Sequence, residues 1–159
     1  RTTRSDGGTT TTVRLSLLRA PRFPDPLTDQ GVHRFRCAVV VGTDIAGAIR
    51  EGYRINLPER QVQGERAVAP HVSVTDPAAI VEAVKLADDR SGDVIVRLYE
   101  AHGGQVRTAL TASFPLSGVE PNDLLERPMP DAESFVLDGQ TIDLRLRPFE
   151  IVTLRLRRA

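Results

Sequence analysis

The stretch VIVRLYEAHGG, residues 94–104, gathers side chains that can donate, accept and exchange protons. Arg97, Tyr99, Glu100 and His102 lie within six residues of one another. A guanidinium and a phenol bind carboxylates or sugar hydroxyls, and a carboxylate beside an imidazole can perform acid–base chemistry. The cluster is consistent with a binding site, with an interface to another protein surface, or with a strand that ends in solvent.

The alternation of residue types in this stretch indicates a β-strand, because successive side chains of a strand point to opposite faces of the sheet. Apolar side chains occupy every second position at its start: Val94, Val96 and Leu98. Glu100 extends that inward face at the end of the strand, and Arg97 and Tyr99 fall on the opposite face. The strand therefore ends with polar groups on both faces.

The spacing of the other reactive residues gives little support for catalysis by this chain alone. His33 and Cys37 share a face of an expected strand but stand about 13 Å apart along it, whereas zinc ligands lie about 2 Å from the metal. Neither a Gly-x-Ser-x-Gly motif nor a phosphate-binding glycine loop is present. Glu82 and Glu100 fall on strands that can be neighbours, and a retaining glycosidase needs two carboxyls about 5–5.5 Å apart. Since most other acidic residues lie in turns, we expect no catalytic residue and no metal ligand here.

Length and charge fit one globular domain. The 159 residues include 21 basic and 21 acidic side chains, a balance that predicts neither a nucleic acid nor an anionic membrane as partner. No apolar run reaches the length of a transmembrane helix, and we identify no signal-peptide pattern. The chain does not begin with Met, so we expect a processed chain or an excised piece. Cys37, the single cysteine, excludes an internal disulfide framework; its apolar neighbours predict a small buried side chain, and a cytoplasmic location fits.

Short segments with strand periodicity, separated by turns, predict an all-β chain. These segments are residues 13–19, 33–41, 79–87, 94–104, 106–114 and 149–157, with a hairpin at Asp138-Gly139. In that hairpin Ile142, Leu144 and Leu146 should face inward, and Asp143, Arg145 and Arg147 outward. Residues 79–87 are apolar on both faces and should lie centrally, forming a meander with the next two segments. We predict an antiparallel two-sheet β-sandwich with at most one short helix.

Three stretches differ from this pattern. Residues 20–31 contain three prolines, which cannot donate to a β-ladder, and should form a long ordered loop. Residues 43–58 can form a short helix, with Ile45, Ile49 and Tyr53 about one turn apart. Residues 1–12 are polar and rich in Gly and Thr. We therefore expect a flexible leader over 1–12 and a β-sandwich module over 13–159.

Several motifs occur in an order that resembles one enzyme family. They are LSLLRAPRFPDPLTDQGVHRF, REGYRINLP, SVTDPAAIVEAVKLADDRSGDVIVRLYEAHGG, DLLERP and LRPFEIVTLRLR. The chain resembles, from about Val13 to Arg157, the C-terminal β domain of bacterial α-mannosidases of glycoside hydrolase family 38. VEAVKLADDRSGDVIVRLYEAHGG is the most specific of these motifs; RPFEIVTLRL is weaker, since similar closing strands occur in other glycosidase sandwiches.

The resemblance implies that the chain is the C-terminal module of a larger enzyme, a retaining exo-α-mannosidase. Such a parent would bind zinc through His and Asp residues of an N-terminal α/β barrel, which also supplies the nucleophilic Asp, and a helical bundle and β domains would follow. None of the barrel motifs occurs in this sequence. No zinc ligand or nucleophile is therefore carried onto this chain, which we expect to be inactive alone. Its expected partners are the remaining domains of the parent and, through them, an α-mannoside.

The resemblance also suggests what the polar strand end contacts. In the parent enzyme it would pack on another domain or edge the sugar-binding cleft, with Arg97 as an ion-pair or sugar donor, Tyr99 as a flat platform and Glu100 as an acceptor. The candidates for this rim or domain interface are Arg97, Tyr99, Glu100, His102, Asp29, Gln30 and His33. Domain packing, sugar contact and plain surface are open for each of them.

Two other classes of β-sandwich stay open as alternatives. An independent carbohydrate-binding module usually displays a row of exposed aromatic rings, whereas this chain has two Tyr, five Phe and no Trp. A structural sandwich of the immunoglobulin type would contain a disulfide and a buried Trp, and both are missing here.

Overall fold

A computed structural model describes residues 2–3, 6–10, 12–130 and 135–159. The chain divides into two compact units, residues 1–39 and 40–159, and each is described by itself. In the first unit, β1 (Thr2–Thr3) pairs antiparallel with β2 (Thr9–Thr10). Positions 1, 4–5 and 11 of the expected leader lie outside the described residues.

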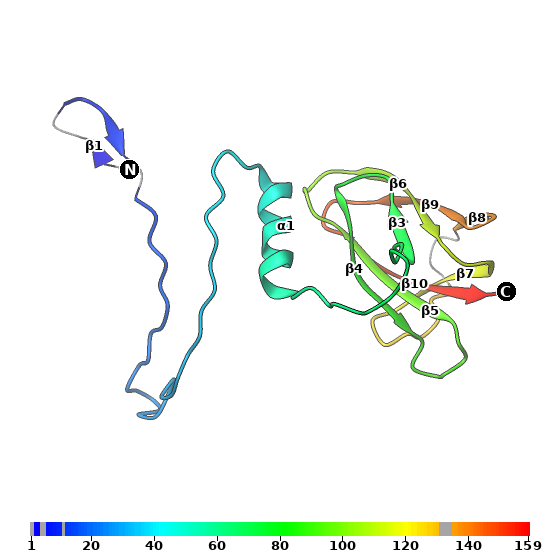
Figure 1. The fold of residues 1–159 in the computed structure, drawn as a ribbon, viewed down its shortest axis with the longest axis horizontal. Helices are drawn as coiled ribbons and strands as arrows, with labels where there is room; N and C mark the ends of the chain where they lie inside the picture. The colour runs from blue at the N-terminus through cyan, green and yellow to red at the C-terminus, as the bar shows by residue number, and fades with distance from the viewer. Residues whose placement is uncertain (1, 4–5, 11, 131–134) are drawn as a thin grey trace. The chain divides into compact units, whose positions relative to one another are not determined.

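The second unit is a sandwich of two four-stranded antiparallel sheets (Figure 1). The first sheet has the order β4-β5-β10-β7, made of Ala79–Leu86, Val94–Glu100, Ile151–Arg158 and Leu116–Asn122. The second has the order β3-β6-β9-β8, made of Val72–Val74, Val106–Ala112, Thr141–Leu146 and Val136–Asp138. This architecture confirms the predicted fold class.

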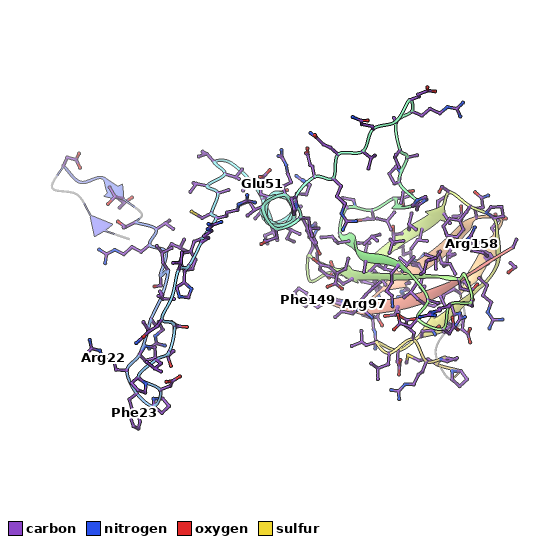
Figure 2. All side chains as sticks on the ribbon, turned by 60° about the horizontal axis from the view of Figure 1, so that its bottom comes forward. Arg22, Phe23, Glu51, Arg97, Phe149 and Arg158 are labelled. Atoms are coloured by element: carbon purple, nitrogen blue, oxygen red, sulfur yellow. The ribbon has the colours of Figure 1, made fainter. Side chains whose placement is uncertain are left out.

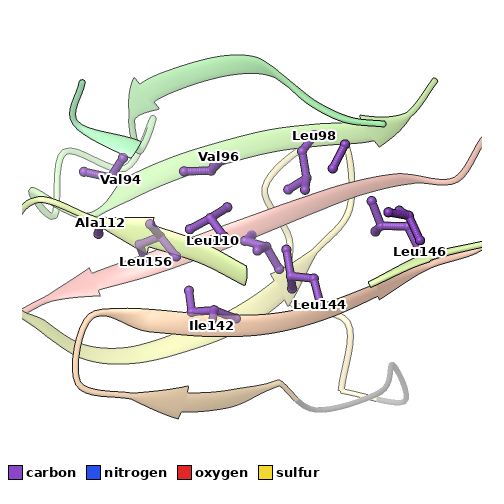
Figure 3. Packing of buried hydrophobic residues seen from close by; sticks show 12 residues of the cluster. Val94, Val96, Leu98, Leu110, Ala112, Ile142, Leu144, Leu146 and Leu156 are labelled. Atoms are coloured by element: carbon purple, nitrogen blue, oxygen red, sulfur yellow. The ribbon is translucent and has the colours of Figure 1, made fainter. Parts of the chain in front are cut away.

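The core lies between the two sheets and is built from the alternation read in the sequence (Figure 3). Ile142, Leu144 and Leu146 of β9 are buried, as predicted, and pack with inward side chains of β5, β6 and β10. Burying one such aliphatic side chain contributes about 1.5–3 kcal/mol. The hairpin at Asp138-Gly139 is also confirmed, since Asp138 pairs with Thr141 across the turn. The cluster therefore fixes which face of each strand is left for other contacts.

The second unit also contains α1 (Ile45–Asn56), which confirms the short helix predicted within 43–58. Asp44 caps its start, because its carboxylate accepts a hydrogen bond from the Gly47 backbone N–H at 2.7 Å. That hydrogen bond holds the pKa of Asp44 below its ordinary value. No helix among the described residues is both long and apolar enough to cross a bilayer.

Two predicted strands, residues 13–19 and 33–41, are wrong for this structure, because neither segment belongs to a β-ladder. Their apolar side chains are exposed: Val13 by 88%, Leu15 by 64% and Val39 by 91%. The prediction of a buried Cys37 is wrong for the same reason, since its side chain is exposed. Within the described residues, no strand is a ladder partner of either segment.

The predicted central position of residues 79–87 is also wrong. β4 is an edge strand, and its apolar Val84 and Leu86 are exposed near its end. A register shift between Val81 and Ala83 changes which side chains face inward, and this explains why the segment is apolar on both faces. The predicted meander is wrong as well: β10 takes the position beside β5, so β6 crosses to the other sheet.

Candidate functional site

The end of β5 has the two-faced arrangement that the sequence predicts. Val94, Val96 and Leu98 point into the core and Glu100 follows on the same face, with only 1% of its surface exposed. The register pairs Arg97 with Thr153 and Tyr99 with Ile151. Arg97 and Tyr99 therefore lie on the outer face of the first sheet, where both are partly exposed.

Glu100 is a buried carboxylate that two loops surround with backbone donors. Its Oε1 accepts a hydrogen bond from the His102 N–H at 2.8 Å, and its Oε2 accepts from Gly103 at 2.8 Å and Phe149 at 3.0 Å. Burial by itself raises the pKa of Glu100, but the N–H groups of Phe149, His102, Gly103 and Gly104 outweigh it and hold the pKa below its ordinary value. The carboxylate thus fastens the turn after β5 to the turn before β10.

The two fastened turns also constrain one another directly. Gly103 has φ +77°, and a Cβ at this position would lie 2.7 Å from the Phe149 ring. Phe149 itself has φ +57° and extends from the β9–β10 turn, in which Arg147 and Glu150 form an ion pair at 2.7 Å (Figure 2). The exposed His102 side chain therefore stands on a turn with a fixed backbone.

The polar groups of the outer face are already engaged by the chain itself. Arg97 donates to Thr153 Oγ1 at 3.3 Å and to the Leu124 carbonyl at 3.2 Å (Figure 2). The Tyr99 hydroxyl lies 3.3 Å from that of Tyr53 on α1. This hydroxyl pair, together with burial, raises the pKa of Tyr53 to about 12. The helix therefore covers part of the candidate rim.

Asp29, Gln30 and His33 belong to the other compact unit, residues 1–39. They stabilise the proline-rich loop locally: the Gln30 amide donates to the Pro26 carbonyl at 3.1 Å, and His33 Nε2 lies 2.8 Å from the Asp29 carbonyl oxygen. All three side chains are exposed. The structure thus describes the seven candidates as two separate sets.

Glu82 and Glu100, the two carboxylates that the sequence places on neighbouring strands, differ in their surroundings. Glu82 is exposed at the register shift of β4, whereas Glu100 is buried opposite Ala79. The residues that the structure describes contain no group of three or more His, Cys, Asp or Glu that could hold a metal ion. Glu100, the buried carboxylate of this strand end, has backbone partners on both oxygens and therefore supports the two turns.

The sequence reasoning missed an ionic network on the outer face of the first sheet. Arg155 pairs with Asp89 at 2.7 Å and Asp93 at 2.8 Å, and Lys85 pairs with Asp88 and Glu126. The Ser91 backbone N–H and hydroxyl, followed by Arg155, lower the pKa of Asp89 to about 2. The acidic residues of the turn at 88–93 were the only sign of this network in the sequence. They did not reveal it, because Arg155, which pairs with Asp89 and Asp93, lies far away in the sequence.

A second feature missed by sequence reasoning is a groove of about 510 Å³ over the other sheet. Its lining includes Arg107, Phe135, Asp143 and Arg145, and the register places Arg107 directly opposite Arg145. In the described part of the chain, neither guanidinium has a carboxylate within ion-pair distance. Among the described residues, this face therefore carries two guanidinium groups without an ion-pair partner.

Comparison with known proteins gives consistent matches. Residues 78–154 match the sequence model of the glycosyl hydrolases family 38 C-terminal beta sandwich domain. The chain is 36% identical over 154 residues to human alpha-mannosidase 2C1, a match that covers 91% of this chain and 15% of that protein. It is 28% identical to alpha-mannosidase G of Dictyostelium discoideum (90% and 14% covered) and 26% identical to an alpha-mannosidase of Saccharomyces cerevisiae (91% and 16% covered).

Proposed function

We propose that the chain is a non-catalytic module of an α-mannosidase, because residues 78–154 match the sequence model of the glycosyl hydrolases family 38 C-terminal beta sandwich domain. One observation carries the proposal: the matches to α-mannosidases cover about nine tenths of this chain but only about 15% of the length of those proteins. A chain of this kind works as a part of a longer enzyme. Its partners are then the remaining domains of that enzyme, and its substrate is the parent's α-mannoside.

The chemistry of the parent's reaction lies outside this chain in our proposal. Retaining hydrolysis needs a nucleophilic carboxylate and a carboxylic acid about 5–5.5 Å apart, and here Glu82 and Glu100 are not placed as such a pair. The described residues also do not fit a zinc site. We therefore assign zinc and the nucleophile to the remainder of the parent, and we keep the cytoplasmic location as a prediction.

The contribution of this module is to hold a rigid turn at the edge of the sugar-binding cleft. The Glu100 carboxylate fixes the backbone of residues 102–104, and this leaves the His102 imidazole exposed on a constrained support. Pre-positioned side chains bind a sugar or a neighbouring domain with less loss of conformational entropy than mobile ones. We place His102 and Arg97 at this contact and treat Glu100 as the support of His102.

The proposal is tested by measuring hydrolysis of an aryl α-mannoside by the isolated chain and by the intact parent polypeptide, each with and without added zinc. The isolated chain is expected to show no turnover and the parent to be active. In the parent, His102→Ala should raise KM or lower kcat/KM, whereas His71→Ala, another exposed histidine of the sandwich unit, should not. Turnover by the isolated chain, free of contaminating host enzyme, contradicts the non-catalytic assignment.

A further inference from the structure

Residues 13–41 contain two segments whose composition suits β-strands but which have no strand partner among the described residues. In residues 13–19 the odd-numbered positions begin Val13, Leu15, Leu17, and in residues 33–41 the odd-numbered positions after His33 are Phe35, Cys37, Val39 and Val41. The opposite face of the first segment begins with Arg14 and Ser16 and ends with Leu18; that of the second begins with Arg34 and Arg36 and continues with Ala38 and Val40. The first part of each segment therefore has the pattern of a strand with one buried and one solvated face, and the end of each segment is apolar on both faces.

The backbone of these two segments also lacks hydrogen-bond partners among the described residues. No backbone hydrogen bond of residues 13–19 or 34–41 occurs among the described residues, and both segments lie outside every sheet. Between them, residues 20–31 form an ordered loop with turns closed by Thr28 N–H to Asp25 and Gln30 N–H to Leu27. The backbone of residues 13–39 therefore runs out and back (Figure 1), and most of the large apolar side chains of this region are exposed.

The relatives indicate where the missing partner resides. A match that covers 91% of this chain must include most of residues 13–41. This region therefore has a counterpart in a protein of which the match covers only 15%. Uncovered strand edges and contiguous apolar faces are costly in an isolated protein. Adding strands to an existing sheet satisfies both the backbone and the side chains at once.

We propose that residues 13–19 and 33–41 are two β-strands that complete a sheet in the remainder of the parent α-mannosidase, with their odd-numbered apolar side chains in its core. The inference rests on the proposed function and names the interface of that module. It separates the chain into a sandwich that is complete in itself and an arm, residues 13–41, that belongs structurally to another domain.

Cys37 provides a built-in reporter, because it lies on the face that should become buried. Its reaction with a maleimide, followed by peptide-resolved mass spectrometry, is compared in the 159-residue chain and in the native parent. Labelling in the parent is expected to be about 100-fold slower or more, as for a side chain that is reached only by local unfolding. The amides of residues 13–19 and 33–41 should also exchange slowly only in the parent. Equal labelling rates in the two proteins overturn the proposal.

The matched control moves the thiol by one residue, to the opposite face. Arg36→Cys in a Cys37→Ser background should label rapidly in both proteins, because position 36 faces solvent in the proposed strand. Equal protection at both positions in the parent means burial without strand alternation and also overturns the proposal. Slow labelling of Cys37 in the isolated 159-residue chain, together with a dimer in size-exclusion chromatography, would mean that the arm packs on a second copy of the chain. This result also overturns the proposal.

Two further variants separate this inference from the proposed function. In the parent, Leu17→Asp on the apolar face should restore rapid labelling of Cys37, whereas Ser16→Asp on the opposite face should not. Labelling that stays slow with Leu17→Asp overturns the proposed packing. If the parent is active but its wild-type Cys37 is labelled as fast as in the isolated chain, the strand proposal is wrong. The proposal that the chain is part of an α-mannosidase is then unaffected.

Discussion

The arm and the sandwich carry the same residue pattern with opposite outcomes. Leu15 alternates with polar neighbours just as Leu144 does, yet Leu15 is 64% exposed and Leu144 only 3%. β9 pairs on both sides, with β6 and with β8, whereas residues 13–19 pair with nothing within the described residues. Alternation therefore specifies which faces a strand will have, and only a neighbouring strand and an opposing sheet turn that potential into a buried strand.

The largest effect is expected where this comparison is tested most directly. In the isolated chain, Leu144→Ala should lower the free energy of unfolding by about 2–5 kcal/mol because it opens a cavity in the core. The matching change Leu15→Ala should alter it by less than about 0.5 kcal/mol, as for an ordinary surface position. Urea unfolding followed by circular dichroism measures both. Similar losses for the two variants would show that the arm is already part of the core.

A smaller effect is expected at the polar end of the sandwich, where the chain satisfies its own buried charge. Glu100→Gln keeps the volume but points an amide donor at backbone N–H donors, so it should cost about 1–3 kcal/mol. Glu82→Gln, at the exposed register shift of β4, is the control and should change stability little. A Glu100→Gln variant as stable as the wild type would mean that the two turns do not depend on this carboxylate.

The pH dependence of the same pair gives a second readout of the Glu100 carboxylate. The folded-state pKa of Glu100 is lowered, so its contribution to stability is complete above its ordinary value of 4.5 and is lost as the pH falls through the folded-state pKa. The difference in unfolding free energy between wild type and Glu100→Gln should therefore shrink as the pH drops below about 4.5. A difference that grows on acidification would reverse the sign of the assigned shift.

An intermediate loss of stability is expected for a substitution in the turn after β5. Gly103→Ala should cost about 1–2 kcal/mol, because φ is positive and the new Cβ meets the Phe149 ring. Gly104→Ala, whose Cβ would meet nothing within 4 Å, is the control. Thermal melts of the two variants are compared. Adding Phe149→Ala to Gly103→Ala should recover the part of the loss that comes from the clash and leave the part that comes from φ.

The smallest change in stability is expected for Arg97, which is bound within the sandwich and is also proposed to contact the parent. Its two hydrogen bonds are long and partly exposed, so Arg97→Ala should change the unfolding free energy of the isolated chain by less than about 1 kcal/mol. The same change in the parent should reduce activity or loosen the docking of the domain. A loss of several kcal/mol in the isolated chain would make Arg97 an internal structural residue.

Sequence reasoning predicted the parts of the fold that depend on local pattern. The hairpin at Asp138-Gly139, the inward face of β9 and the short helix containing Tyr53 followed from turn chemistry and periodicity. The position of β4 did not, because an edge strand with a register shift is apolar on both faces, as a central strand is. Strand order depends on pairings between distant residues, which a periodic pattern does not contain.

The candidate site was predicted in its composition but not in its connections. The two faces at Tyr99 and Glu100 followed from strand alternation. The donors from Phe149 and the pairing of Tyr99 with Tyr53 did not, since both come from segments far away in the sequence. The exposure of Cys37 was missed because apolar neighbours indicate burial only when something is present to cover them.

The place of β10 in its sheet bears on how the protein is made. β10 lies between β5 and β7 and joins them, although residues 151–158 are the last of these strands to be synthesised. During synthesis on the ribosome, β4 can pair with β5 early, but β5 and β7 cannot be joined until β10, which lies between them, has been made. A premature stop codon just before residue 151 therefore removes the middle of a sheet and leaves two new edges exposed to other nascent chains.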